Sequence, residues 1–111
     1  MEAKIYKIDL QDFRTPKANV FIGRKRGQEV RERSKIDEEE AKVDSITIVI
    51  PETIASINPS FLEEFLFNVV RKLGNIGFRQ KIKFINDGAY KIDSDLEESI
   101  DRILTEENAL A

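Results

Sequence analysis

The chain has 111 residues and a formal net charge of -3 at pH 7, with 41% hydrophobic and 35% charged residues. This length fits one domain, and the composition is typical of a globular chain rather than a disordered one. The lack of cysteine and histidine excludes disulfides, thiolate nucleophiles, the Ser-His-Asp triad and nearly all zinc chemistry. We therefore expect a protein that is not an enzyme, with no catalytic residues, no metal site and no cofactor.

Charge and hydropathy also bear on location and partners. A mildly acidic chain argues against a dedicated nucleic-acid binder. The longest apolar run, residues 46–50, is far shorter than the roughly 20 residues that span a membrane, and the N-terminus shows no signal-peptide pattern. These features favour a cytoplasmic protein without membrane contact, and they leave the oligomeric state open.

The first elements in chain order are two strands. Apolar residues at a spacing close to two predict a strand over residues 5–10 with one face in solvent. After a connection over residues 12–19, residues 19–22 form a second short strand that ends at Gly23. We expect these two strands to form an opening hairpin.

A basic turn and a surface helix come next. Gly23 and Gly27 bracket the basic residues and predict the turn. Helix-forming residues predict a helix over 28–42, and its thin apolar stripe predicts that it lies loosely held on the surface. The acidic run 37–40 is expected to be a solvated face.

The middle of the chain carries the clearest patterns. Ser45 to Ile50 is β-branched and nearly continuous, which predicts a central strand covered on both faces. Apolar residues at spacings of one, three and four predict a helix over 60–73, with Gly74 as its stop. Residues 81–86 predict another strand, which should pair parallel to the central strand through a right-handed crossover.

The last predicted element is a helix over residues 95–106. Ser94 and Glu97 have the spacing of a capping box at its start, and the tail from residue 107 is expected to fray. The order strand, strand, helix, strand, helix, strand, helix predicts a single α/β domain over residues 1–111. Its fold is expected to be a mixed sheet of about four strands with two to three helices packed on it.

Ser60 lies at the most informative place, the link between the central strand and its helix, because ligands gather at the carboxyl ends of strands in open α/β sheets. Ser60 and Glu63 have capping-box spacing, which predicts Ser60 as the N-cap. The same hydroxyl could accept a phosphate, which the helix dipole would favour and Glu63 and Glu64 would repel. The two roles do not exclude each other.

Several segments together resemble one family. They are the strand Ile46-Thr47-Ile48-Val49-Ile50, the stretch Ile57-Asn58-Pro59-Ser60-Phe61-Leu62-Glu63-Glu64, Leu73-Gly74, Gly77-Phe78, the strand Ile82-Lys83-Phe84-Ile85-Asn86, and upstream Gly23-Arg24 and Gly27-Gln28-Glu29-Val30-Arg31-Glu32. They look like the STAS-like domain family of small cytoplasmic bacterial and phage-associated proteins, which is related to the STAS domains of anti-sigma factor antagonists. The resemblance covers roughly residues 20–104, between an N-terminal strand with its connection (1–19) and the tail (105–111).

The resemblance implies a non-enzymatic interaction domain with a STAS-like fold. In anti-sigma factor antagonists the corresponding loop reads Asp-Ser-Ser-Gly, and a partner kinase phosphorylates its second serine. Ser60 stands at that serine, while Asn58, Pro59 and Phe61 take the other three places in order. The implied partner is similar to the histidine-kinase-like ATPases that act as serine kinases and anti-sigma factors. The implied partner-binding residues are Asn58, Pro59, Ser60, Glu63 and Glu64, with Ser60 as the phosphoacceptor.

A second candidate site is the basic segment Arg24, Lys25 and Arg26. A glycine-flanked basic turn could bind phosphate or a nucleic-acid backbone, although the spacing of a P-loop is absent. The alternative is a solvated turn whose charges pair with the acidic run 37–40. An accessory nucleic-acid or phosphate-binding protein is therefore the second functional hypothesis.

Overall fold

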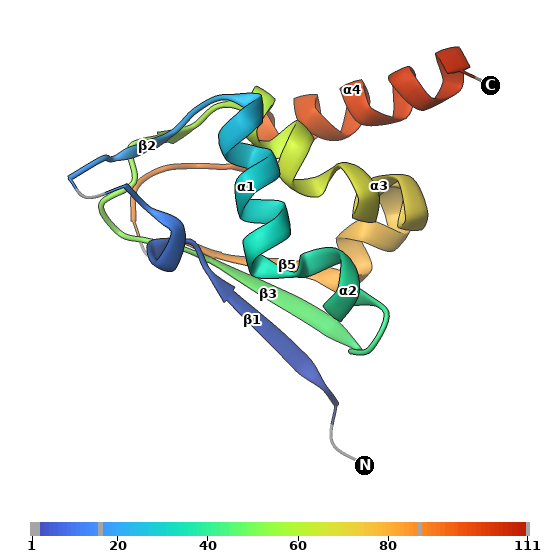
Figure 1. The fold of residues 1–111 in the computed structure, drawn as a ribbon, viewed down its shortest axis with the longest axis horizontal. Coiled ribbons are helices and arrows are strands. Elements are labelled where there is room, and N and C mark those ends of the chain that lie inside the picture. The colour runs from blue at the N-terminus through green and yellow to red at the C-terminus, as the bar shows by residue number, and fades with distance from the viewer. Residues whose placement is uncertain (1–2, 16, 87, 111) are drawn as a thin grey trace.

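Strands and helices alternate along the chain and build an α/β fold (Figure 1). The computed structural model describes residues 3–15, 17–86 and 88–110, with side chains up to residue 105. The elements in chain order are β1 (Ile5–Asp9), the 3-10 helix η1 (Leu10–Phe13), β2 (Val20–Phe21), α1 (Arg24–Ser34), α2 (Ile36–Glu40), β3 (Ser45–Ile50), β4 (Ser56–Ile57), α3 (Pro59–Lys81), β5 (Ile82–Asn86) and α4 (Asp93–Leu110).

β3 is the central strand of the main sheet and is parallel to both neighbours, β1 and β5. The predicted parallel pairing of β3 with β5 is confirmed. The expected opening hairpin and mixed sheet are wrong, because β2 pairs with β4 in a separate parallel sheet of two strands. A hairpin needs a tight turn. Here Asp9 instead caps η1 by accepting a hydrogen bond from the Gln11 N–H at 2.9 Å, which turns the chain away from β1.

The helices cover only one face of the main sheet (Figure 1). Ile46, Ile48 and Ile50 of β3 are fully buried on the covered face. Ser45 and Thr47 alternate with them and are partly exposed. Coverage of β3 on both faces is therefore wrong for the first part of the strand, where the Ser-Ile-Thr-Ile alternation is the pattern of a strand with one open face. Val49, on the same face as Ser45 and Thr47, is 9% exposed. The open face leaves Ile5 61% and Ile85 49% exposed at the two edge strands.

The basic segment does not form a turn, because α1 begins at Arg24. Gly23 precedes the helix at a φ of 97°, and Gly27 lies inside it, where α1 crosses α3. The predicted helix over 28–42 is broken at Lys35, which has a left-handed φ of 60° and separates α1 from α2. Val30 and Ile36 are fully buried, so the two helices belong to the core rather than to a loosely held surface.

Both long helices exceed their predicted bounds. Gly74, predicted as a stop, does interrupt α3 with a non-helical φ of 73°, but the helix resumes and runs to Lys81. α4 begins at Asp93 and the Leu96 N–H donates to the Ile92 carbonyl at 2.8 Å, so Ser94 lies inside the first turn and is not the predicted cap. The helix continues through the predicted frayed tail to Leu110, whereas residue 111 lies outside the described residues. Within the described part of the chain, no helix has the length and apolar character that crossing a bilayer requires.

Candidate functional site

The small sheet brings two helix starts together. β2 and β4 are paired in register, Val20 with Ser56 and Phe21 with Ile57, and each strand leads almost at once into a helix. The Asn58 N–H donates to the Phe21 carbonyl at 2.8 Å, which fixes the link before α3 beside the link before α1 (Figure 1). The two sequence segments singled out as separate candidates, 24–26 and 58–64, therefore meet at one end of the fold.

Asn58, not Ser60, caps α3. The Asn58 Oδ1 accepts hydrogen bonds from the Ser60 N–H at 2.9 Å and from the Ser60 hydroxyl at 2.7 Å. Pro59 occupies the first helical position, where a missing N–H costs nothing and the fixed φ suits the helix. The predicted Ser60–Glu63 capping box is thus wrong, because the helix starts earlier and Ser60 is its second residue. Asn58 is exposed, Ser60 is partly exposed, and Phe61 is fully buried in the core.

Glu63 is held inside the protein rather than offered to a partner. Its side chain is almost fully buried, which carries a large desolvation cost unless the charge is compensated. Two arginines supply the compensation. Arg24 Nη2 lies 3.5 Å from Glu63 Oε1, and Arg102 Nη1 lies 3.4 Å from Glu63 Oε2.

Glu64 extends these contacts into a row of alternating charges. Arg24 Nη1 and Arg31 Nη1 each lie 3.6 Å from a Glu64 carboxylate oxygen, and Arg31 also donates to the Glu64 carbonyl at 2.7 Å. At the far end Arg102 Nη2 lies 2.8 Å from Glu98 Oε1. We refer to this row, which ties α1, α3 and α4 together, as the charge ladder: Arg31, Glu64, Arg24, Glu63, Arg102 and Glu98.

The basic segment does not present its three charges together. Arg24 points toward α3, whereas Arg26 donates to the Phe13 carbonyl and pairs with Glu29 at 3.1 Å. Lys25 is exposed. The expected pairing of this segment with the acidic run 37–40 is also wrong, since Arg24 forms its ion pairs with Glu63 and Glu64 of α3 and Arg26 with Glu29 of α1.

Glu40, the last residue of the acidic run, is buried and paired with two lysines. Glu40 is 2% exposed, and its carboxylate lies 2.7 Å from Lys81 Nζ and 2.9 Å from Lys72 Nζ. Burial by itself would raise the pKa of Glu40, but the hydrogen bonds and charges of Lys81 and Lys72 outweigh it and hold the pKa below its ordinary 4.5. The expectation of a fully solvated acidic face is therefore wrong at Glu40, which fastens α2 to α3.

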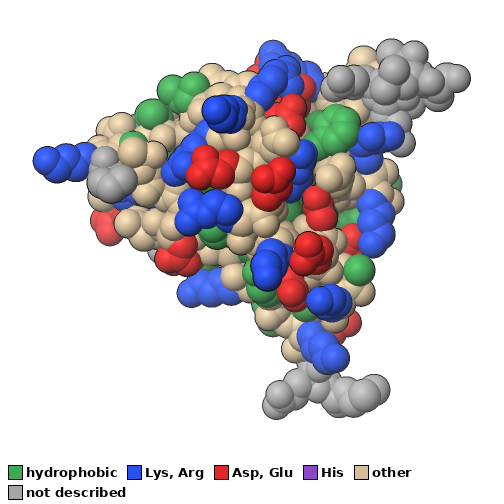
Figure 2. All heavy atoms as spheres, viewed as in Figure 1, with side chains coloured by type: hydrophobic (Ala, Val, Ile, Leu, Met, Phe, Trp, Pro, Cys, Tyr) green, Lys and Arg blue, Asp and Glu red, His purple; other side chains and the backbone are tan. Residues whose placement is uncertain are grey.

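An exposed apolar side chain lies next to the start of α3. Ile22 is 58% exposed and directly follows Phe21, whose carbonyl accepts the hydrogen bond from Asn58. We call the surface formed by Ile22, Arg24, Asn58 and Ser60 the rim. From the rim a groove of about 280 Å³ runs between α1 and α3, lined by Arg24, Arg31, Glu64, Phe67 and Asn68. Over the face that carries α1 and α2, basic and acidic side chains are interspersed (Figure 2).

Tyr90 links the segment after β5 to β4, the strand that leads to Asn58 and Ser60 of the rim. Its hydroxyl lies 2.6 Å from Asp95 Oδ2 and 3.2 Å from the Ile57 carbonyl, in β4. Burial, and then the hydrogen bond and charge of Asp95, raise the pKa of Tyr90 well above its ordinary value. The hydroxyl therefore stays protonated and acts as a structural donor.

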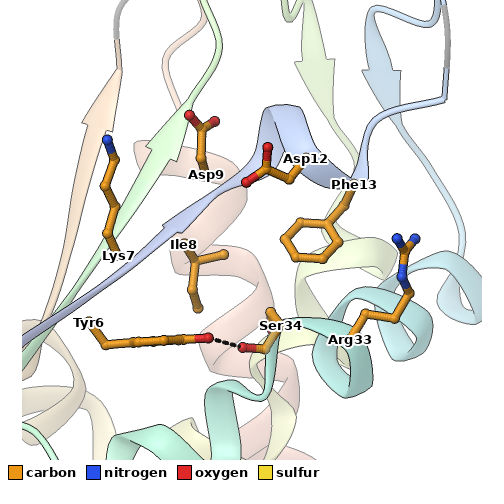
Figure 3. A pocket seen from close by; sticks show the side chains of 8 residues that line it. All are labelled: Tyr6, Lys7, Ile8, Asp9, Asp12, Phe13, Arg33 and Ser34. Carbon is orange, nitrogen blue, oxygen red and sulfur yellow. Dashed lines mark hydrogen bonds between the residues drawn. The ribbon is translucent and has the colours of Figure 1, made fainter.

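A separate pocket of about 120 Å³ lies between β1, η1 and α1 (Figure 3). The Tyr6 hydroxyl donates to the Ser34 carbonyl at 2.6 Å, and the Arg33 guanidinium lies over the Phe13 ring, 5.3 Å from its centroid. Pockets that hold small molecules are usually about 300–1,000 Å³. This pocket is smaller than that range, and the two contacts join the β1–η1 segment to α1. Among the residues that the structure describes, no group of three or more acidic side chains could hold a metal ion.

Sequence reasoning missed two residues of this region, Ile22 and Arg102. Arg102 has a local signal, its spacing of four from Glu98, but nothing local shows that α4 packs against the start of α3. One contact of this packing is at Ser99, whose hydroxyl lies 3.2 Å from the Pro59 carbonyl. Comparison of the chain with protein-family models, curated proteins and solved structures finds no match. The fold and the rim define an α/β domain that offers two neighbouring helix starts to solvent.

Proposed function

We propose that this chain is a regulatory protein–protein interaction module of the STAS-like kind, with the rim as its partner-binding surface. The observation that carries the proposal is the β2–β4 pairing, which sets an exposed isoleucine and an exposed arginine beside an accessible serine. Apolar and arginine side chains of this kind are enriched at the centres of protein interfaces. Glu63 is buried and supports the rim from behind, whereas Glu64 is partly exposed in the groove that runs from the rim.

The proposed partner is a cytoplasmic bacterial ATPase of the histidine-kinase type, acting as a serine kinase or anti-sigma factor. This part of the proposal is supported by the resemblance of residues 20–104 to the STAS-like family. In the transfer, the Ser60 Oγ bonds to the γ-phosphorus of ATP held by the partner. The bond from that phosphorus to its bridging oxygen breaks, ADP leaves, and the hydroxyl proton passes to a base of the partner.

A phosphate at Ser60 would change the docking surface. It adds about -1.5 to -2 charges next to Ile22, and burying that charge against a partner is costly without compensation. The unmodified chain is therefore the binding form, and modification of Ser60 releases the partner.

The test begins with the genes next to the one that encodes this chain, where the proposal predicts an ATPase of the histidine-kinase type. Binding of the purified ATPase is then measured by titration calorimetry. Ser60→Glu should weaken binding at least about tenfold, which corresponds to about 1.4 kcal/mol, while Ser60→Ala binds like the wild type. Ser94→Glu is the matched control, because Ser94 is the exposed second residue of α4 as Ser60 is the second residue of α3. Equal binding by Ser60→Glu and Ser60→Ala would remove the switch.

A second measurement decides against the competing function. A nucleic-acid binder would be retained on DNA or RNA at low salt, and Arg24→Ala with Arg26→Ala would abolish the retention. The interaction module predicts no such retention, and clear retention lost in the double variant would overturn the proposal.

A further inference from the structure

Helix geometry places Ser60 between the two glutamates of the charge ladder. At about 100° per residue, Glu63 lies about 60° to one side of Ser60 around the helix axis and Glu64 about 40° to the other. Both follow Ser60 by about one turn, and helical side chains slope toward the N-terminus. The two carboxylates of α3 therefore lean toward the surface that Ser60 occupies.

Arg24 bridges these two carboxylates, with Nη2 at 3.5 Å from Glu63 Oε1 and Nη1 at 3.6 Å from Glu64 Oε1. A guanidinium that contacts both carboxylates lies between them around the helix axis. Ser60 lies in the same angular position, one turn closer to the start of α3. The Arg24 side chain is 58% exposed and so has room to rotate. Because this guanidinium contacts both side chains that follow Ser60 by one turn, we expect it to lie near a group attached at the Ser60 hydroxyl.

Of the three arginines in the charge ladder, Arg24 is held least closely, so moving it away costs the least free energy. Its contacts at 3.5 and 3.6 Å are long compared with the about 2.7–2.9 Å of strong charge-assisted hydrogen bonds. Arg102 and Arg31 are held more tightly, by Glu98 at 2.8 Å and by the Glu64 carbonyl at 2.7 Å. When Arg24 leaves, Glu63 keeps Arg102 and Glu64 keeps Arg31, so neither carboxylate is left without a cation.

We infer that Arg24 senses the state of Ser60: a phosphate on Ser60 draws the Arg24 guanidinium off Glu63 and Glu64 and into a bidentate pair with the phosphate. This inference rests on the proposed phosphorylation of Ser60. The sequence predicts that Glu63 and Glu64 repel the phosphate, but the arginines of the ladder neutralise both. Before modification the rim presents a guanidinium beside Ile22, and afterwards it presents a net negative phosphate–arginine pair.

The experiment uses the full chain with phosphoserine encoded at position 60 and follows the second ionisation of the phosphate by phosphorus NMR. A nearby guanidinium favours the dianion, so this pKa should lie about half a unit or more below the ordinary value of about 6. Arg24→Gln should return it most of the way, whereas Arg31→Gln should change it little. Phosphoserine at position 94 is the control, because it reports the effect of a helix start alone.

The inference is overturned if the phosphate at position 60 titrates alike in the wild type and in Arg24→Gln, or like the phosphate at position 94. Urea unfolding of each variant verifies that it is folded during the titration. No partner is present in this experiment, so its failure is distinct from failure of the proposed function. A lowered phosphate pKa without any effect of Ser60→Glu on ATPase binding would remove the interaction proposal alone.

Discussion

The crossing of α1 and α3 depends on Gly27, and its replacement by alanine tests the packing that assembles the rim. A Cβ at position 27 would lie 2.3 Å from the Phe61 carbonyl oxygen, 3.2 Å from the Phe61 carbonyl carbon and 3.0 Å from Glu64 Cβ. Two of these atoms belong to the backbone of α3 and cannot swing away, so the helices must separate. Overpacking of this kind costs about 1–3 kcal/mol.

Alanine also improves helix propensity by about 1 kcal/mol, which offsets part of this cost. We therefore expect Gly27→Ala to lower the free energy of unfolding by up to about 2 kcal/mol, measured by urea denaturation followed by circular dichroism. For a domain of this size, each kcal/mol lowers the melting temperature by roughly 4–8 °C. Separation of the helices should also weaken the contacts of Arg24 and Arg31 with Glu64 and reduce binding at the rim.

Gly77→Ala is the matched control. A Cβ there would meet only the Leu73 Cβ at 3.3 Å, so the gain in propensity should leave this variant as stable as the wild type or slightly more stable. If Gly27→Ala is as stable as Gly77→Ala, the argument that α1 and α3 need a glycine at their crossing is wrong.

Three further predictions concern buried charge, the tyrosines and backbone strain. Glu40→Gln should cost about 2 kcal/mol, because both lysine contacts lose their charge. The lowered pKa of Glu40 means that its contribution is complete above pH 4.5 and is lost as the pH falls through that lower value, so the variant should lose less stability than the wild type in acid urea titrations. Burial is the main cause that raises the pKa of both Tyr6 and Tyr90 above 10.0, so absorbance titration should show both phenols ionising at higher pH in the folded chain than in the unfolded chain. Stability should fall as the pH rises above 10, since there the unfolded chain loses the protons more readily, and Tyr90→Phe should reduce this fall. Lys35→Gly should raise the unfolding free energy by about 1 kcal/mol, because Lys35 has a left-handed φ of 60° that glycine adopts without penalty.

Elements could be predicted from sequence where one local pattern dominates. The β-branched run of β3 and the apolar stripe of α3 each specify an element without reference to the rest of the chain. Gly27 shows the limit of this reasoning. A glycine that marks a turn and a glycine that permits close helix packing look alike in sequence, and only the position of Phe61 decides between them.

The start of α3 contains two overlapping signals, and the structure follows the earlier one. Ser60 with Glu63 has capping-box spacing, but Asn58 with Pro59 also fits the preferred residues at the N-cap and first helical positions. A capping box at Ser60 would require the Glu63 carboxylate to bend back to the backbone. That carboxylate is instead held by Arg24 and Arg102, whose positions depend on the packing of α1 and α4 and leave no trace in the local sequence.

Large apolar side chains are exposed on the open face of the main sheet, at the rim and at Ile76 of α3, and charge separates the first two of these surfaces. The open face of the main sheet exposes Ile5 and Ile85, but Lys7 and Lys83 lie between them in the same register row as Thr47. Lysines on such a face keep it solvated and discourage association. At the rim, by contrast, the exposed Ile22 lies two residues before Arg24, whose guanidinium already pairs with Glu63 and Glu64. We therefore propose the rim, rather than the open sheet face, as the surface that a partner covers and where a phosphate on Ser60 would change the charge that the partner meets.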